Sequence, residues 1–358
     1  MPDASPAKWH LAHTTWFFET FVLRDRVPGY HAFDDRFGYL FNSYYEAEGA
    51  RQRRDHRGLL TRPDLATILT YRAHVDASII DAWPGFDAAA RALIELGTHH
   101  EQQHQELLLT DILHLFAQNP LQPVYAAVAP MPPVAPTAMR WIEHPGGIAA
   151  IGHDGAGFAF DCEGPAHRVL LQPFRLADRL ITNGDWLEFM AGGGYATPSL
   201  WLSDGWSWVQ REGIAAPLYW EQRDGGWTTF TLAGRRAIDP AAPACHVSYY
   251  EADALAAWAG ARLPREAEWE TMARVRPDLP QLYDAGWQWS GSAYLPYPGF
   301  RTAPGAVGEY NGKFMSGQAV LRGGSCATPP GHSRPSYRNF FYPHQRWQFT
   351  GVRLAQDA

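Results

Sequence analysis

Hydrophobic positions in the first third of the chain recur with the period of an amphipathic helix. Ser5 followed by Pro6 predicts a helix start with Ser5 as the N-cap, since proline is tolerated at the first helical position, and the apolar run continues to about Leu23. Further helical segments are predicted over 37–47, 63–83 and 87–118, separated by Gly and Pro. Consecutive amphipathic segments of this kind are typical of an antiparallel helical bundle.

The remaining two thirds of the chain show a different pattern. Short Val, Ile, Trp and Phe segments are interrupted every few residues by Gly or Pro, which predicts short strands and sparse regular structure. Two helices stand out. One follows a capping box formed by Ser248 and Glu251, and another begins at Pro264.

Composition supports a division into two domains. Residues 1–118 hold 9 of the 15 histidines but only 6 of the 33 glycines. Six prolines between Pro120 and Pro136 cannot continue a helix and predict a semi-rigid linker. The expected organisation is a helical bundle over 1–119, a Pro-rich linker over 120–136 and a second domain over 137–358. The fold class is therefore α+β.

Charge and cysteine content exclude several classes of function. The formal net charge of −7 disfavours nucleic acid and anionic membrane as partners. No stretch approaches the ~18 apolar residues of a membrane span, and the N-terminus lacks a signal-peptide pattern, so a cytoplasmic protein is expected. The three cysteines, Cys162, Cys245 and Cys326, are too far apart to form a disulfide framework or a Cys-x-x-Cys metal site.

The strongest chemical signal is a histidine pair, His100 and His104, within the last predicted helix of the bundle. Residues four apart share one helix face, so both imidazoles can reach the same ion. His13 lies among Trp9 and Trp16 on a face that should point into the bundle, where coordination would offset its desolvation. His10 and His99 are rival ligands, and the spacing fits Fe(II) and Zn(II) equally well.

Several motifs resemble one enzyme family along nearly the whole chain. The runs SPAKWHLAHTTWFFETF from Ser5, FNSYYE from Phe41 and HHEQQHQE from His99 resemble the DinB-type domain of EgtB-family ergothioneine sulfoxide synthases. RLPREAEWE from Arg262, SAYLPYPGF from Ser292, LRGGSCAT from Leu321 and YRNFFYP from Tyr337 resemble the formylglycine-generating-enzyme fold. That fold is similar to C-type lectins.

The resemblance implies an iron(II) enzyme with His13, His100 and His104 as ligands. Such an enzyme uses O2 to join the sulfur of cysteine or γ-glutamylcysteine to the imidazole C2 of hercynine and to oxidise that sulfur to a sulfoxide. Three open positions would hold the reactants side by side. The family usually carries one more helix before SPAKWHLAH, so we expect a bundle that lacks it and exposes apolar surface.

Two sets of bundle residues match family positions with assigned roles. Gln103 matches a hercynine contact, although a solvated helix residue would look the same. Tyr44 and Tyr45 match a tyrosine pair that supplies a proton to the oxygen chemistry, although both could be ordinary bundle aromatics. If both tyrosines lie on a helix, they point about 100° apart, and one of them reaches the metal.

The remaining candidate residues concern the sulfur donor and the trimethylammonium group. Arg51 and Arg54, in a cluster with Arg53 and Arg57, either form a solvated loop or clamp the donor carboxylate. Asn339, Phe340 and Phe341 stand where the γ-glutamylcysteine branch carries Asn-Trp-Asp, which favours free cysteine as donor. Trp347, with Phe349, either faces the trimethylammonium group or belongs to the core.

Other readings stay open at this point. Cys326 directly follows Ser325 with no second cysteine nearby, which argues against copper-dependent formylglycine formation and predicts a buried Cys326. A selenoneine synthase-type relative would share the same histidines. A DinB-type metal-dependent thiol transferase would need no O2, and a non-catalytic lectin-like binding protein would hold a structural zinc.

Overall fold

The computed structural model describes residues 4–127, 137–303, 308 and 310–358. They form two compact units. The first comprises Met1–Leu115 and Arg301–Lys313, and the second comprises Phe116–Phe300 and Phe314–Ala358. The mixture of helices and strands confirms the predicted α+β class. Residues 128–136 of the predicted linker lie outside the described part of the chain.

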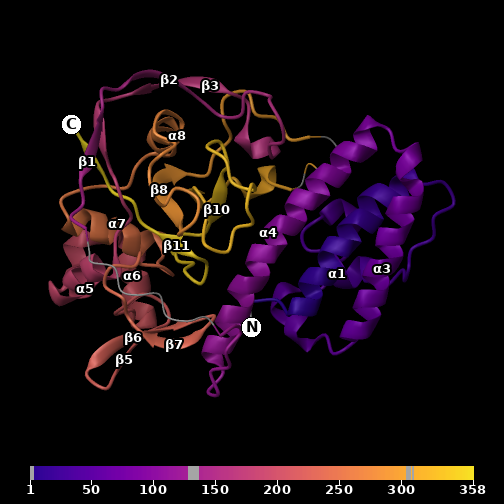
Figure 1. Ribbon diagram of the computed structural model, residues 1–358, viewed down its shortest axis with the longest axis horizontal. Coiled ribbons are helices and arrows are strands. Elements are labelled where there is room, and N and C mark those ends of the chain that lie inside the picture. The colour runs from indigo at the N-terminus through magenta and orange to yellow at the C-terminus, as the bar shows by residue number, and fades with distance from the viewer. Residues whose placement is uncertain (1–3, 128–136, 304–307, 309) are drawn as a thin grey trace. The chain divides into compact units, whose positions relative to one another are not determined.

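The first unit is built from helices (Figure 1). Helices α3 and α4 occupy the predicted positions, and α1 ends earlier than expected, because from Glu19 the helix continues as a π-helix to Arg24. Their bounds are α1 Ala7–Phe18, α2 Phe37–Phe41, α3 Leu65–Ala82 and α4 Ala88–Gln118.

The predicted cap of α1 is wrong. Pro6 is the cap residue, and no side chain caps this helix. The backbone N–H of Ser5 instead donates to Oδ2 of Asp111 on α4, at 2.7 Å. Ser5 therefore ties the start of α1 to α4, and the acidic side chain at this end of α1 suits the helix dipole.

A buried carboxylate fixes the chain after α1. Glu19 accepts hydrogen bonds from the Tyr71 hydroxyl on α3 at 2.6 Å, and from the Tyr30 hydroxyl and the Phe33 N–H at 2.9 Å each. Glu19 itself is buried. These three donors satisfy the carboxylate and hold the loop that leads from α1 to α2.

The helix predicted over 37–47 ends at Phe41. The Asn42 side chain accepts from the Tyr45 N–H at 3.0 Å and donates to the Tyr45 carbonyl at 2.8 Å. A side chain that bonds the backbone three residues ahead offers an alternative to the helical hydrogen bonds. Residues 42–45 therefore form a turn, and Tyr44 and Tyr45 lie outside any helix.

The described residues of the second unit contain short strands arranged in four small sheets, with strand orders β1-β4-β12, β2-β3, β5-β6-β7 and β10-β9-β8-β11. Apart from the parallel pair β8 and β11, neighbouring strands are antiparallel. The strand bounds are β1 Trp141–His144, β2 Gly147–Ile151, β3 His167–Leu171, β4 Phe174–Ala177, β5 Trp220–Arg223, β6 Gly226–Thr231, β7 Gly234–Ala237, β8 Trp287–Ala293, β9 Ala319–Arg322, β10 Asn339–Phe341, β11 Thr350–Gly351 and β12 Ala355–Asp357.

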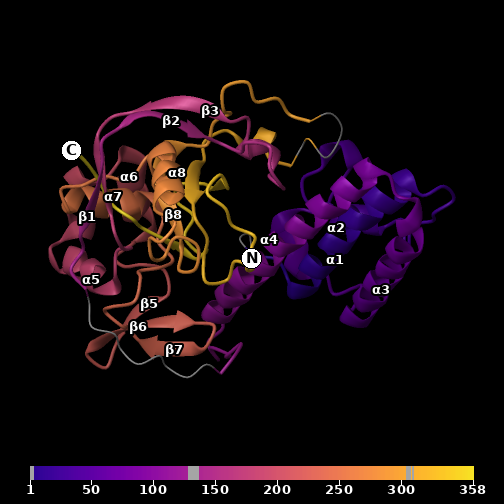
Figure 2. The ribbon, with the colours of Figure 1, turned by 45° about the horizontal axis from the view of Figure 1, so that its top comes forward.

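The α-helices that accompany these sheets are α5 Asn183–Ala191, α6 Ser203–Glu212, α7 Tyr249–Trp258 and α8 Glu266–Val275. The capping box of Ser248 and Glu251 before α7 is confirmed. Helix α8 begins two residues later than predicted. The hairpin of β2 and β3 arches over α8 (Figure 2), where Trp269 and Met272 join a core with Leu171.

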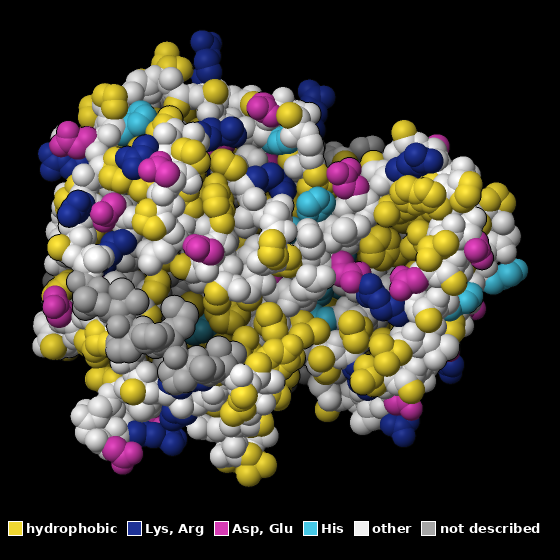
Figure 3. Space-filling model, in the orientation of Figure 1, with side chains coloured by type: hydrophobic (Ala, Val, Ile, Leu, Met, Phe, Trp, Pro, Cys, Tyr) yellow, Lys and Arg dark blue, Asp and Glu magenta, His cyan; other side chains and the backbone are white. Residues whose placement is uncertain are grey.

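The structure tests two expectations about which side chains are exposed and which are buried. Leu65, Leu69 and Ile80 of α3 are exposed, and hydrophobic side chains gather on the helical unit in Figure 3, so the bundle exposes apolar surface as expected. The prediction of a buried Cys326 is wrong, because its side chain is exposed. Among the described residues, no helix is long and apolar enough to cross a membrane.

The Arg-Gly-Gly-Ser turn after β9 generates a testable prediction. Gly323 has φ +97°, and a Cβ there would lie 2.3 Å from the Leu282 carbonyl oxygen; Gly331 has φ +80° but open space around it. Gly331→Ala should cost about 1–2 kcal/mol of backbone strain. Gly323→Ala should cost about 1–3 kcal/mol more, because the backbone must move. Urea unfolding of both variants measures the difference, and equal losses would contradict the close approach.

Candidate metal centre

Three histidines converge inside the first unit. His13 comes from α1, and His100 and His104 come from successive turns of α4. Each offers one ring nitrogen, and these three atoms lie within 4.8 Å of one another. The four-residue spacing on α4 places both of its imidazoles on the face toward His13, as the sequence predicted.

Stacked rings fix the plane of the His13 imidazole. The Trp9 ring stacks on the His13 ring with centroids 4.7 Å apart and an interplanar angle of 11°. The Trp16 ring stacks on it with centroids 5.7 Å apart and an angle of 15°. The Nδ1–H of His13 donates to the Phe41 carbonyl at 2.6 Å. This hydrogen bond leaves Nε2 as the lone-pair nitrogen, and Nε2 is buried without a hydrogen-bond partner in the described part of the chain.

His100 is the least satisfied of the three histidines. It is buried, and neither ring nitrogen has a hydrogen-bond partner among the described residues. Its ring lies 5.0 Å from Phe17 and 4.6 Å from His104, between centroids. Because an unsatisfied buried polar group costs about 1–3 kcal/mol, a ligand at this point would remove a real penalty.

His104 and its neighbour His10 are hydrogen-bonded to each other. Their Nδ1 atoms lie 2.9 Å apart, and Nε2 of His10 lies 3.0 Å from Oδ2 of Asp111. His10, considered from the sequence as a rival ligand, thus has both nitrogens engaged. His99, the other rival, is outside the converging group.

Burial sets the charge of the three converging rings. Desolvation, reinforced by the neighbouring imidazoles, holds the pKa of His13 and of His104 well below the usual histidine value. Desolvation alone lowers the pKa of His100 to about 3. All three are therefore neutral near pH 7, which is the form that binds metal. Three neutral imidazoles, of which His13 and His100 have buried nitrogens without a partner among the described residues, fit a divalent transition-metal ion such as Fe(II) or Zn(II).

A segment from far along the sequence completes this site. Residues 301–313 belong to the first unit, and within them the Tyr310 hydroxyl donates to Oε1 of Gln103. The Tyr310 ring lies 5.5 Å from that of His100 and 6.1 Å from that of Tyr44. Sequence reasoning missed Tyr310, because nothing local to it indicates that this Gly-rich stretch returns to the bundle.

Tyr44 and Tyr45 lie beside the histidines but not in the predicted arrangement. Their rings stack on each other, with centroids 4.7 Å apart. The expected divergence of about 100° is wrong, because Asn42 ends the helix before them. Tyr45 is buried against Phe21 at 5.0 Å, whereas Tyr44 is half-buried and faces Tyr310.

The arginine cluster divides into exposed and buried members. Arg51 pairs with Glu46, Arg53 pairs with Asp55, and Arg54 is exposed. Arg57 is buried, with its guanidinium 3.5 Å above the Trp9 ring and bonded to the Ser5 and Ser43 hydroxyls. Desolvation and the nearby arginines lower its pKa to about 9. The solvated-loop reading is therefore wrong for Arg57.

The other predicted substrate residues belong to the second unit. Asn339, Phe340 and Phe341 form β10 and are half-buried. Phe340 stacks on Tyr294 with centroids 4.1 Å apart. Trp347 is buried. Their suggested roles toward substrate stay predictions.

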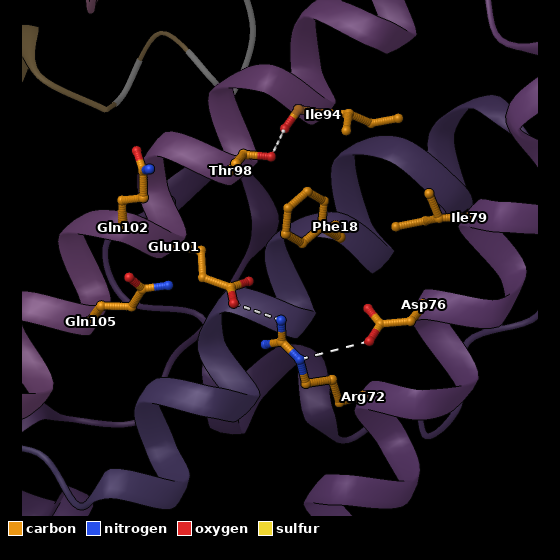
Figure 4. A pocket seen from close by; sticks show the side chains of 9 residues that line it. All are labelled: Phe18, Arg72, Asp76, Ile79, Ile94, Thr98, Glu101, Gln102 and Gln105. Carbon is orange, nitrogen blue, oxygen red and sulfur yellow. Dashed lines mark hydrogen bonds and ion pairs between the residues drawn. The ribbon is translucent and has the colours of Figure 1, made fainter. Parts of the chain in front are cut away.

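A hollow of about 380 Å³ lies elsewhere in the first unit (Figure 4). Arg72 crosses it, bonded to Glu101 at 2.6 Å and facing Asp76 at 3.8 Å, with Phe18 and Ile79 alongside. None of the three converging histidines lines this hollow. This hollow is therefore separate from the converging histidines, and we assign it no function.

The chain is similar to several known proteins. Residues 128–290 match the family model described as a sulfatase-modifying factor enzyme 1-like domain. The chain is 34% identical to the hercynine oxygenase of Mycolicibacterium smegmatis, over 100% of this chain and 92% of that protein. It is also 34% identical to the hercynine oxygenase of Mycobacterium tuberculosis, over 99% and 92%. The formylglycine-generating enzyme of Streptomyces coelicolor is 34% identical over 42% of this chain and 52% of its own length.

The lowered pKa of His100 predicts how stability depends on pH. An unfolded histidine takes up a proton near pH 6.5, whereas folded His100 does so only near pH 3, so stability falls as the pH drops below about 6.5. By pH 5 this histidine alone should cost the metal-free protein about 2 kcal/mol. His100→Gln should therefore lose less stability than the wild type between pH 7 and pH 5 in urea unfolding. The exposed His31→Gln serves as control, and identical pH profiles for wild type and His100→Gln would refute the prediction.

Proposed function

The chain belongs to the hercynine oxygenase family, and from this premise we propose that it is an iron(II)- and O2-dependent sulfoxide synthase. Its substrates are hercynine and a thiol, either cysteine or γ-glutamylcysteine. The observation that carries the proposal is the set of three neutral imidazoles, with His13 and His100 buried and His104 half-buried, whose ligand atoms lie within 4.8 Å of one another.

The metal would be held by Nε2 of His13 and by one ring nitrogen each of His100 and His104. When bound, iron(II) supplies the one-electron chemistry that lets O2 react with closed-shell organic substrates. Three protein ligands leave positions for substrates, unlike a closed structural zinc site with four. The aromatic residues Trp9, Trp16 and Phe17 around the rings limit access of water.

The proposed reaction balances without an external reductant. The C2–H bond of the hercynine imidazole and the S–H bond of the thiol are broken, and a C–S bond forms. One oxygen atom ends on sulfur and the other leaves as water with the two hydrogens. The four electrons that O2 accepts come in equal parts from C–S bond formation and from oxidation of sulfur.

Protein residues in the first unit would orient the substrates and handle protons. Tyr310 engages Oε1 of Gln103, and the side-chain amide of Gln103 is our candidate for a hydrogen bond to hercynine. Tyr44, which is half-buried, stacks on Tyr45 and meets Tyr310 edge-on, is our candidate proton donor. Arg51 and Arg54 remain our candidates for the donor carboxylate, with Asn339, Phe340, Phe341 and Trp347 as further substrate residues.

The reaction is tested by loading the full chain anaerobically with Fe(II) and adding hercynine with cysteine or with γ-glutamylcysteine. We expect O2 uptake and the matching sulfoxide by mass spectrometry. Product with one thiol identifies the donor. Product with a selenium donor alone would favour the selenoneine synthase-type relative, and thiol transfer without O2 uptake would favour the transferase. A bound zinc ion that shows no redox response and no turnover would favour a non-catalytic binding protein.

Removing one ligand tests the metal assignment. His104→Ala should abolish Fe(II) binding and O2 uptake while leaving the circular dichroism spectrum close to that of the wild type. His99→Ala, on the same helix one residue before His100, is the control and should retain both. Normal turnover in His104→Ala would sink the ligand assignment.

The tyrosine pair is tested by removing one hydroxyl at a time. With Tyr44→Phe we expect the fraction of sulfoxide to fall relative to other oxidised thiol products, by tenfold or more if the proton transfer contributes a typical ~100-fold. Tyr45→Phe should change the ratio less, and the exposed Tyr39→Phe is the control. Unchanged product ratios in both Tyr44→Phe and Tyr45→Phe would exclude this role.

A further inference from the structure

A buried hydrogen-bonded chain runs from α4 through α1 and back to α4. Oδ2 of Asp111 lies 3.0 Å from Nε2 of His10, and Nδ1 of His10 lies 2.9 Å from Nδ1 of His104. Asp111 and His10 are both buried. These hydrogen bonds therefore join the Asp111 carboxylate to His104, one of the three converging histidines, through the imidazole of His10.

The carboxylate determines which atoms donate and which accept in this series of hydrogen bonds. Oδ2 of Asp111 already accepts the Ser5 N–H at 2.7 Å, and a carboxylate has no proton to donate, so Nε2 of His10 is the donor to it. In its neutral form His10 has one donor and one acceptor, so its Nδ1 is then the acceptor. Nδ1–H of His104 must then donate to His10, and Nε2 of His104 carries the lone pair.

We propose that His10 and Asp111 are positioning residues that hold His104 in the tautomer with a bare Nε2 directed to the metal. The proposal rests on the proposed function for the presence of the ion, but the tautomer is a property of the metal-free chain. His13 reaches the same state by a separate route, its Nδ1–H bond to the Phe41 carbonyl at 2.6 Å. Two of the three ligands are thus oriented before any ion binds.

Such outer hydrogen bonds hold a ligand ring in orientation and raise its basicity, and their loss typically weakens metal binding by about 10–100-fold. Here the hydrogen bonds reach His104 through the His10 imidazole rather than through a carboxylate in direct contact. His10 separates the negative charge of Asp111 from His104, so the carboxylate sets the donor order without itself entering the site. The Ser5 N–H, just before α1, donates to the same oxygen of Asp111.

The tautomer is tested by long-range ¹H–¹⁵N NMR of the metal-free, ¹⁵N-labelled full chain. In the wild type we expect Nδ1 of His104 to give a protonated, pyrrole-type signal and Nε2 a bare, pyridine-type signal. His10→Gln keeps an acceptor for His104 and a donor for Asp111, so it should preserve the pattern. His10→Leu keeps neither, so His104 should become a mixture of tautomers. The His13 signals, held by Phe41, report in the same spectrum that α1 is still folded.

Metal affinity gives the second readout. Anaerobic titration with Fe(II) alone, in competition with a chromophoric chelator, should show at least tenfold weaker binding by His10→Leu and near wild-type binding by His10→Gln. Asp76→Asn, an exposed carboxylate on α3, is the control. A protonated Nε2 on His104 in the wild type would overturn the proposal, as would unchanged tautomer and affinity in His10→Leu. The expected tautomer in a protein that forms no sulfoxide would refute the function and leave this inference standing.

Discussion

The first unit depends on bringing three imidazoles together, His13 and His100 buried and His104 half-buried, with one ring nitrogen of each within 4.8 Å of the others. Neutral rings at this spacing gain nothing from one another and lose bonds to water, so the surrounding structure must hold them. Trp9 and Trp16 stack around His13, the Phe41 carbonyl fixes its tautomer, and His10 engages His104. The helices that supply these contacts therefore orient the histidine rings as well as form a core, which is the arrangement expected of a preorganised site.

The sequence was a good guide where chemistry follows local periodicity. The four-residue spacing placed His100 and His104 on one face, and the aromatic neighbours of His13 indicated a buried ring. It was a poor guide where a local side chain competes with the helix or where distant contacts decide. Asn42 ends the helix by bonding the backbone of Tyr45, and Tyr44 then stacks on Tyr45. The approach of α1 to α4 makes His10 a partner of Asp111 rather than a rival ligand, and Trp9 provides a surface that buries Arg57. No spacing rule predicts these last two contacts.

The second unit meets a different demand, because its strands are short and long loops must be fixed without continuous backbone ladders. Buried ion pairs join segments that are distant in the sequence. Arg338 binds Glu266 at 2.9 Å between Nε and Oε2, and Arg322 binds Glu270, with both side chains fully buried. Since one member of such a pair is costly to leave without the other, these contacts favour one arrangement of the loops over alternatives more than they add stability. The fold class was predictable from Gly and Pro punctuation, but the pairing of charges was not.

The return of residues 301–313 to the helical unit bears on how such a protein can be inherited. Tyr310 and Lys313, which contact Gln103 and Tyr44, are encoded far downstream of the bundle they join. A gene split or recombined between the two halves would deliver a bundle with its histidines but without its tyrosine. The halves are therefore not interchangeable modules, and lineages that keep this site should keep both in one reading frame.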